Sequence, residues 1–296
     1  MLQFIKKIEL PPEENCSFDH GDVDQTTGRV YVAHTSSGTV EVFDGQQERW
    51  IKKIPDCAGG SGVIFDTINN RIFAASRSAG HILSIEGNST DVVLKFETGK
   101  KPNGLAVDGE RGILMTADVG DNYARFHSQN TGEVLASVKL SGRPRWSAYR
   151  KASDQYLINI MEPSGVEFIS GKDFSRTGFY PIDQKGPHGL VIVGSFAYVA
   201  SDDATLSKFN IDSKELAGKA ALAGPPDVLW HNAKQNLVYC SIGDPGVVQV
   251  FDGKTLEIVQ EVKTEYDSHT LTFDEKRQKL YTFQPTAIQL ESTKPN

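Results

Sequence analysis

Three of the seven histidines stand at equivalent places in a repeated pattern, and an aspartate holds the same place in another unit. His20, His188 and His269 each mark the start of a short apolar segment, and Asp227 marks the start of the unit between His188 and His269. Imidazoles beside a carboxylate can bind a divalent metal ion, which polarises a carbonyl or lowers the pKa of a water. Without a metal they could form a polar site, or they could only hydrogen-bond the backbone at strand ends. The sequence therefore predicts a possible divalent metal site of unknown identity at His20, His188, His269 and Asp227.

A general acid–base interpretation uses some of the same side chains. It pairs His188 with Asp202, which follows in the same unit. His188 and His269 would exchange protons, and Arg145, which holds the equivalent place in a further unit, would orient the substrate. These three residues are the predicted catalytic set.

Arg145 also heads the predicted substrate-binding set. It follows Pro144 and precedes Trp146. A guanidinium can hold a carboxylate or phosphate through two parallel hydrogen bonds, and an indole can stack on it or on a ligand. An ion pair to Glu162 or Asp118 within the repeated structure is the structural alternative. The predicted substrate-binding residues are Asn103, Arg145, Trp146, Arg77, Asp118 and Glu162.

A repeat must position these residues. Lys101–Asp108 is a proline–glycine start followed by an apolar strand that ends in aspartate, and Gly112–Asp118 is a second apolar strand after a turn. A period near forty residues with several short strands is typical of a β-propeller blade. The first strand of a unit starts, at intervals of 39 to 43 residues, near His20, Ser61, Asn103, Arg145, His188, Asp227 and His269.

Each unit carries four strand patterns, but the last unit lacks an outer strand and residues 2–10 form a spare one. We therefore expect an all-β chain that forms a single domain over residues 1–296. The predicted fold is a seven-bladed β-propeller of four-stranded antiparallel blades. The N-terminal strand, residues 2–10, would complete the last blade and close the ring, which removes exposed sheet edges.

The repeat also predicts which residues share a face. Adjacent strands of a blade run antiparallel, so the start of the first strand and the end of the second lie at the same mouth of the central channel. His34 could reach this mouth, whereas His81, His127 and His231 are expected to face solvent. The second strands end at His34, Ser76 with Arg77, Asp118, Glu162, Asp202, Asp244 and Gln284.

Two elements resemble a known family. Val30-Tyr31-Val32-Ala33 and Asn103-Gly104-Leu105-Ala106-Val107-Asp108 are similar to the repeats of YVTN/YncE-like seven-bladed β-propellers, and the similarity covers the full length. The resemblance is specific for fold and not for function, because related propellers include lactonases, lyases, dehydrogenase subunits, surface-layer modules and binding proteins.

Composition narrows the function classes. A formal net charge of −7, with both signs mixed throughout, argues against nucleic acid as a partner. No apolar run is long enough to cross a bilayer, so no membrane association is expected. The N-terminus does not read as a signal peptide, which predicts a cytoplasmic protein, or a periplasmic or secreted one if a leader was removed. Cys16 and Cys57 could form a disulfide bridge, and the alternative is that they are free, semi-buried thiols.

The motifs that the sequence lacks favour a small molecule as the ligand. The sequence has no c-type haem motif, no phosphate-binding loop that would indicate a nucleotide and no Gly-x-Ser-x-Gly elbow. We expect a hydrolase or lyase, lactonase-like, that acts on a polar, anionic small molecule such as a lactone or sugar acid at the channel mouth. The alternative is a non-catalytic, YncE-like binding or protein-interaction module that uses the same face.

Overall fold

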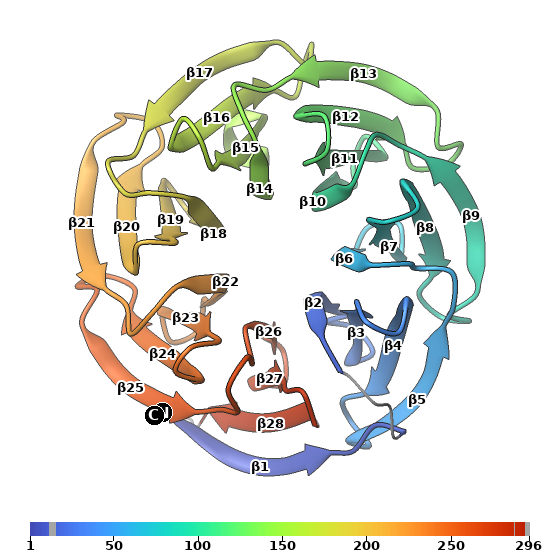
Figure 1. Cartoon of the computed structure of the whole chain (residues 1–296), viewed down its shortest axis with the longest axis vertical. Coiled ribbons are helices and arrows are strands. Elements are labelled where there is room, and N and C mark those ends of the chain that lie inside the picture. Colours follow the sequence, from blue (N-terminus) through green and yellow to red (C-terminus); the bar gives the residue numbers. More distant parts are fainter. Residues whose placement is uncertain (12–15, 287, 294–296) are drawn as a thin grey trace.

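The computed structural model describes residues 1–11, 16–286 and 288–293, and these residues form a β-propeller of four-stranded antiparallel blades. Figure 1 shows the blades around a central axis, and in six of them the strand that comes first in the chain is innermost. Within the described ranges the strands are interrupted by a single short 3-10 helix, η1 (Lys151–Ser153).

Six of the sheets each consist of four consecutive strands. They are β2 (Phe18–Val23), β3 (Arg29–His34), β4 (Thr39–Asp44) and β5 (Arg49–Ile54); β6 (Gly60–Asp66), β7 (Arg71–Ser76), β8 (His81–Glu86) and β9 (Val92–Glu97); β10 (Pro102–Asp108), β11 (Ile113–Asp118), β12 (Tyr123–Ser128) and β13 (Val134–Lys139); β14 (Pro144–Arg150), β15 (Gln155–Ile160), β16 (Gly165–Ser170) and β17 (Arg176–Pro181); β18 (Pro187–Val193), β19 (Phe196–Ser201), β20 (Thr205–Asn210) and β21 (Leu216–Ala221); and β22 (Pro226–Asn232), β23 (Leu237–Ile242), β24 (Val247–Asp252) and β25 (Ile258–Lys263).

A further sheet combines the two ends of the chain. Its strand order is β1 (Leu2–Ile8), β28 (Ile288–Thr293), β27 (Lys279–Phe283) and β26 (Thr270–Asp274). β1 pairs antiparallel with β28, with Leu2 opposite Thr293. This sheet contacts the sheets on both sides of it, because Thr270 Oγ1 donates to the Phe18 carbonyl at 3.3 Å and Ser241 Oγ donates to the His269 carbonyl.

The core lies between the blades. Second strands such as β3 and β7 are buried at all but their first residue, because neighbouring blades cover both faces, whereas outer strands such as β25 alternate between exposed and half-buried residues. Aromatic side chains fill the middle of most second strands. Those with at most 2% of their surface exposed are Tyr31, Phe73, Tyr156, Tyr198, Tyr239 and Tyr281.

Some of these tyrosines tie one blade to the next. Tyr31 donates its hydroxyl to the carbonyl of Gly87 at 3.3 Å, in the turn after the third strand of the next sheet. Tyr198 makes the equivalent bond to Gly253, and Tyr281 makes it to Gly45 at 3.5 Å. The bond from Tyr281 joins the sheet that carries both chain ends to the first consecutive sheet. A buried hydrogen bond of this kind contributes about 1 kcal/mol.

Candidate functional site

An irregularity at the start of the inner strands positions the predicted site residues. The pairing of six inner strands with their neighbours shifts register there, for example between Pro144 and Ser147 in β14 and between Pro187 and Leu190 in β18. Arg145 and His188 lie within these shifts, outside the regular ladder. A bulge re-aims side chains, and here it takes the site residues out of the blade.

Glycines that follow the site residues let the blades meet at this point. A Cβ atom added to Gly104 would collide with the Arg145 carbonyl oxygen, and one added to Gly189 would collide with the Asp227 carbonyl oxygen. Only glycine permits such a close backbone approach. The dipeptides Asn103-Gly104 and His188-Gly189 therefore combine a site side chain with the close packing that places it beside the next one.

His188 is the centre of the polar network at the mouth. Its Nδ1 lies 3.1 Å from Asp202 Oδ1, and its Nε2 lies 3.0 Å from Asp227 Oδ1. Burial and the nearby guanidinium of Arg145 oppose a charge on the ring, but the two carboxylates outweigh them and raise the pKa of His188 to about 9. His188 is thus an imidazolium at neutral pH. Despite its burial, Asp227 has a pKa well below the usual range because of His188 and His269.

The other two histidines differ in charge state. His20 is 5% exposed, its ring centroid lies 4.0 Å from a ring centroid of Trp146, and burial lowers its pKa. The partners of His269 are a backbone carbonyl and a carboxylate. Its Nδ1 lies 2.8 Å from the Asp267 carbonyl oxygen, and its Nε2 lies 3.8 Å from Asp227 Oδ2. Burial opposes its charge, yet Asp227 raises the pKa of His269. The mouth therefore holds one neutral imidazole and two that favour the protonated form.

The predicted metal ligands lie around Asp227, but their arrangement is that of ion pairs. Both ring nitrogens of His188 face carboxylates, and a protonated imidazole has no lone pair to offer a metal. Among residues 1–11, 16–286 and 288–293, no three His, Cys, Asp or Glu side chains are grouped so that they could hold a metal ion. The divalent metal stays a prediction.

Three arginines converge on a cavity of about 170 Å³ at the mouth. Arg145 Nη2 lies 3.2 Å from Asp202 Oδ2 and 3.6 Å from the sulfur of Met161, which Arg143 also contacts at 3.6 Å. Arg77 forms no hydrogen bond or ion pair with any described residue. Burial and the charges of Arg145 and Arg77 lower the pKa of Arg143. The cavity is lined by Asp19, His20, Arg77, Asn103, Arg143, Arg145, His188 and Asp227.

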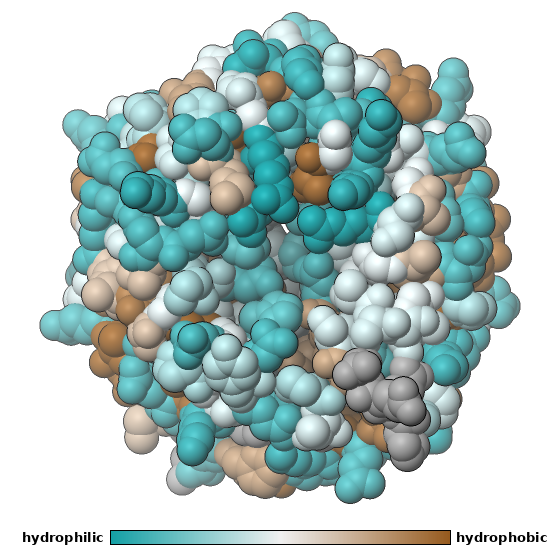
Figure 2. All heavy atoms as spheres, viewed as in Figure 1, coloured by the Kyte–Doolittle hydropathy of each residue, from teal (hydrophilic) through white to brown (hydrophobic). Residues whose placement is uncertain are grey.

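The mouth has a second, acidic side. A cavity of about 330 Å³ shares His188 and Asp227 with the first, and its further charged residues include Asp244, Asp267 and His269. The His188–Asp227 ion pair thus separates a cationic half from an acidic half. Figure 2 shows hydrophilic residues around the central opening of the face in view.

Two predicted substrate-binding residues lie away from the mouth cavities. Asp118 is fully buried within its blade, where it accepts a 2.5 Å bond from Arg125, and burial raises its pKa to about 6. Glu162 is exposed in the turn after β15. Neither pairs with Arg145, whose partner is Asp202. Trp146 lies beneath the mouth against His20, whereas Asn103, Arg77 and Arg145 come together as predicted.

The positions expected for His34, His81 and His127 are wrong. His34 does not reach the mouth; it is buried beside Glu41, 3.1 Å away, and stacks on Phe18. His81 and His127 do not face solvent, because they are 5% and 0% exposed and bond backbone carbonyls or Thr98. His231, which is expected to face solvent, is half-buried and also lines the central channel.

The cysteines contribute no cross-link. Cys16, Cys57 and Cys240 form no disulfide in the part of the chain that the structure describes. Cys57 is buried, which raises the pKa of its thiol to about 12. A bridge between Cys16 and Cys57, which the sequence left open, is therefore absent from these described residues.

Sequence reasoning missed Arg143 and Asp19, which line the arginine cavity next to predicted residues. The signal was present in Arg143-Pro144-Arg145, where two arginines flank the proline that starts β14. Asp19 directly precedes His20 and lies 3.1 Å from its Nε2.

Comparison with protein-family models gives no match, and comparison with curated proteins gives none either. No helix among the described residues is long and apolar enough to span a membrane. The functional interpretation therefore depends on the geometry of the mouth.

Proposed function

We propose that the channel mouth binds a small anionic molecule and that the protein is a hydrolase or lyase, with lactones and sugar acids as the substrate class. The observation that carries the proposal is the cluster of Arg77, Arg143 and Arg145 around one cavity. Asp202 is the carboxylate that pairs with this cluster, through Arg145. Asp19 and Asp227 also line the cavity, but the three guanidinium groups outnumber these two carboxylates. The excess positive charge favours an anionic ligand, which a guanidinium can bind through two hydrogen bonds.

The pKa values of the histidines support proton transfer at the same mouth. His20 has a lowered pKa and would act as the base, whereas His188 has a pKa of about 9 and would act as the acid. Groups whose environments push their pKa values apart are the usual acid and base of one reaction. Asp202 and Asp227 would keep His188 oriented and charged, and Arg145 would orient the substrate anion.

The number of blades and the closure of the ring go beyond the four-stranded blade architecture. We propose that the sheet β1-β28-β27-β26 is the seventh blade and closes the ring, as in the YVTN/YncE-like propellers that the repeats resemble. The support is that the bond from Tyr281 to Gly45 repeats the one from Tyr31 to Gly87 between consecutive blades. A closed ring would fix all the mouth residues relative to one another.

Calorimetric titration with gluconate and with inorganic phosphate tests the binding step. We expect Arg145→Gln and Arg77→Gln each to weaken binding about tenfold, since one charge-assisted bond is lost. Arg49→Gln is the matched control, because Arg49 is exposed on the outer strand β5 and bonds Gln47. Absence of binding by any sugar acid or phosphate to the unaltered protein would contradict the proposal.

Turnover is tested separately. The unaltered protein should convert members of a panel of sugar lactones to product, which is measured by proton release. His20→Gln should lose this turnover but still bind gluconate. Binding without any product would instead support the non-catalytic module.

A further inference from the structure

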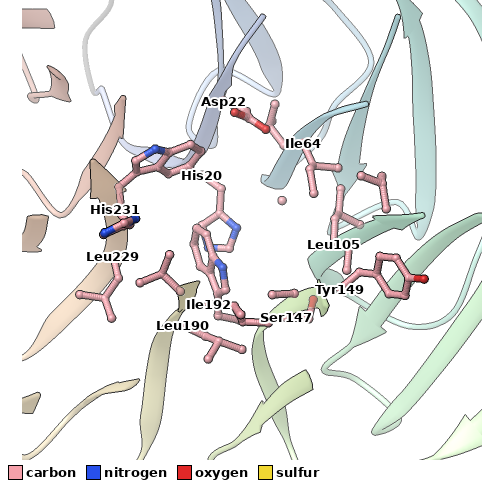
Figure 3. A pocket seen from close by; sticks show the side chains of 18 of the residues that line it. His20, Asp22, Ile64, Leu105, Ser147, Tyr149, Leu190, Ile192, Leu229 and His231 are labelled. Carbon is pink, nitrogen blue, oxygen red and sulfur yellow. The ribbon is translucent and has the colours of Figure 1, made fainter. Parts of the chain in front are cut away.

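Beneath the mouth lies a larger cavity whose lining is of a different kind. It has a volume of about 390 Å³ and is formed by the inner strands β2, β6, β10, β14, β18 and β22. Figure 3 shows side chains from these strands around it, among them Ile64, Leu105, Leu190, Ile192 and Leu229. This volume and this apolar wall with few polar groups are typical of small-molecule sites.

The cavity runs from the mouth toward the opposite face of the propeller. His20 and Trp146, at the starts of β2 and β14, line its mouth end. Ile192 and His231, near the ends of β18 and β22, line its other end together with Glu275 in the turn after β26. Ile192 and His231 are half-buried, so this end is open to solvent.

The charged groups of the cavity are carboxyls. Asp22 and Glu275 line it, and among the described residues no lysine or arginine does. Asp22 accepts bonds from the backbone nitrogens of Val23 at 2.7 Å and Phe65 at 2.8 Å. Burial raises its pKa to about 7, and the neighbouring charge of Asp24 adds to the rise. His231 bonds Asn236 at 3.2 Å, and burial lowers its pKa, so it supplies no opposing positive charge at neutral pH.

We infer that this channel is a second binding site, which takes an elongated, mostly apolar small molecule carrying one cationic group at the end that faces Asp22 and Glu275. Apolar walls hydrate poorly, so an apolar body displaces water favourably. The carboxyl groups of Asp22 and Glu275 then select a cation over an anion. This preference is the opposite of the one proposed for the cavity that the three arginines line. The inference does not depend on the proposed function.

Two fluorescent probes of opposite charge test the site in the full chain at about pH 8, where Asp22 is mostly ionised. We expect the cation thioflavin T to bind about tenfold more tightly than the anion anilinonaphthalene sulfonate. Ile192→Trp and, from the other side of the channel, Ile64→Trp should each reduce thioflavin T binding about tenfold by filling the space. Ile258→Trp is the matched control, because Ile258 is 46% exposed on the outer strand β25.

A second variant separates the charge preference from the space. Asp22→Asn should reduce the difference in affinity between the two dyes, by weakening the binding of thioflavin T without weakening that of the anionic dye. Equal binding of both dyes, or binding that survives both tryptophan variants with the fold intact, would overturn the inference. Tighter binding of the anionic dye that is lost in Arg145→Gln would also overturn it, and would make the channel an extension of the mouth.

Discussion

His188 should make the stability of the protein depend on pH in the alkaline range. Its pKa is about 9 in the folded chain against an ordinary value of 6.5. A group whose folded pKa is raised contributes stability that is fully present below the unfolded pKa and is lost as the pH rises through the folded pKa. The window therefore runs from about pH 6.5 to about pH 9. The difference between the two pKa values corresponds to about 3 kcal/mol of unfolding free energy.

Urea unfolding at about pH 6 and about pH 10 measures this contribution. Other groups titrate in the same range, so the quantity to compare is the difference in unfolding free energy between the unaltered protein and His188→Gln. We expect that difference to fall by about 3 kcal/mol between the two conditions. Asp227→Asn should remove most of this pH dependence. In that variant the Asp202 carboxylate alone favours the charge on His188, whereas burial and Arg145 still oppose it.

An NMR titration of the histidine ring protons gives a direct reading, with the His188 signal assigned by its absence from His188→Gln. The signal should titrate near pH 9 in the unaltered protein and at a lower pH in Asp227→Asn. A His188 that titrates at or below its ordinary value in the unaltered protein would refute the reasoning, because the two carboxylates would then not hold its proton.

Other perturbations have simpler outcomes. Tyr281→Phe should lower the unfolding free energy by about 1 kcal/mol, whereas Tyr266→Phe, whose side chain is 69% exposed, should leave it unchanged in urea unfolding. Equal effects would show that the bond to Gly45 contributes nothing. Deletion of β1 removes the buried side chains of Leu2 and Ile8 and should lower the unfolding free energy by about 3–6 kcal/mol. It should also increase aggregation, which light scattering measures. An unchanged urea midpoint would contradict this. Dialysis against a chelator should leave gluconate binding within about twofold, and a larger loss restored by a divalent ion would revive the metal site.

The repeat made the overall architecture readable from sequence. Intervals of 39 to 43 residues and the alternation within each unit predict four-stranded blades, and they also predict that Asn103, Arg145 and His188 share a mouth. Repeat position says which end of a strand a residue occupies, because every unit obeys the same pleat and connection.

The details that repeat position could not supply are set by local contacts. Asp118 ends the second strand β11 and Asp202 directly follows the second strand β19. Asp118 nevertheless turns into its blade because Arg125 lies in the adjacent strand, whereas Asp202 turns to His188 and Arg145. The repeat position of His127 predicts a solvent-facing ring, but Thr98 and a backbone carbonyl offer it buried partners. Side-chain direction depends on such partners, which lie far from the residue in sequence.

The pairing of β1 with β28 has a consequence for how the protein is made. β1 is synthesised before every other described strand, but its partner β28, in which Thr293 lies opposite Leu2, is synthesised after all of them. During translation β1 must therefore wait as an unpaired strand while the consecutive blades form, and such a strand can pair with other chains. Lys6 and Lys7 lie within it. Charged side chains of this kind discourage pairing between chains, so the segment that completes the last sheet also carries its own protection until that sheet exists.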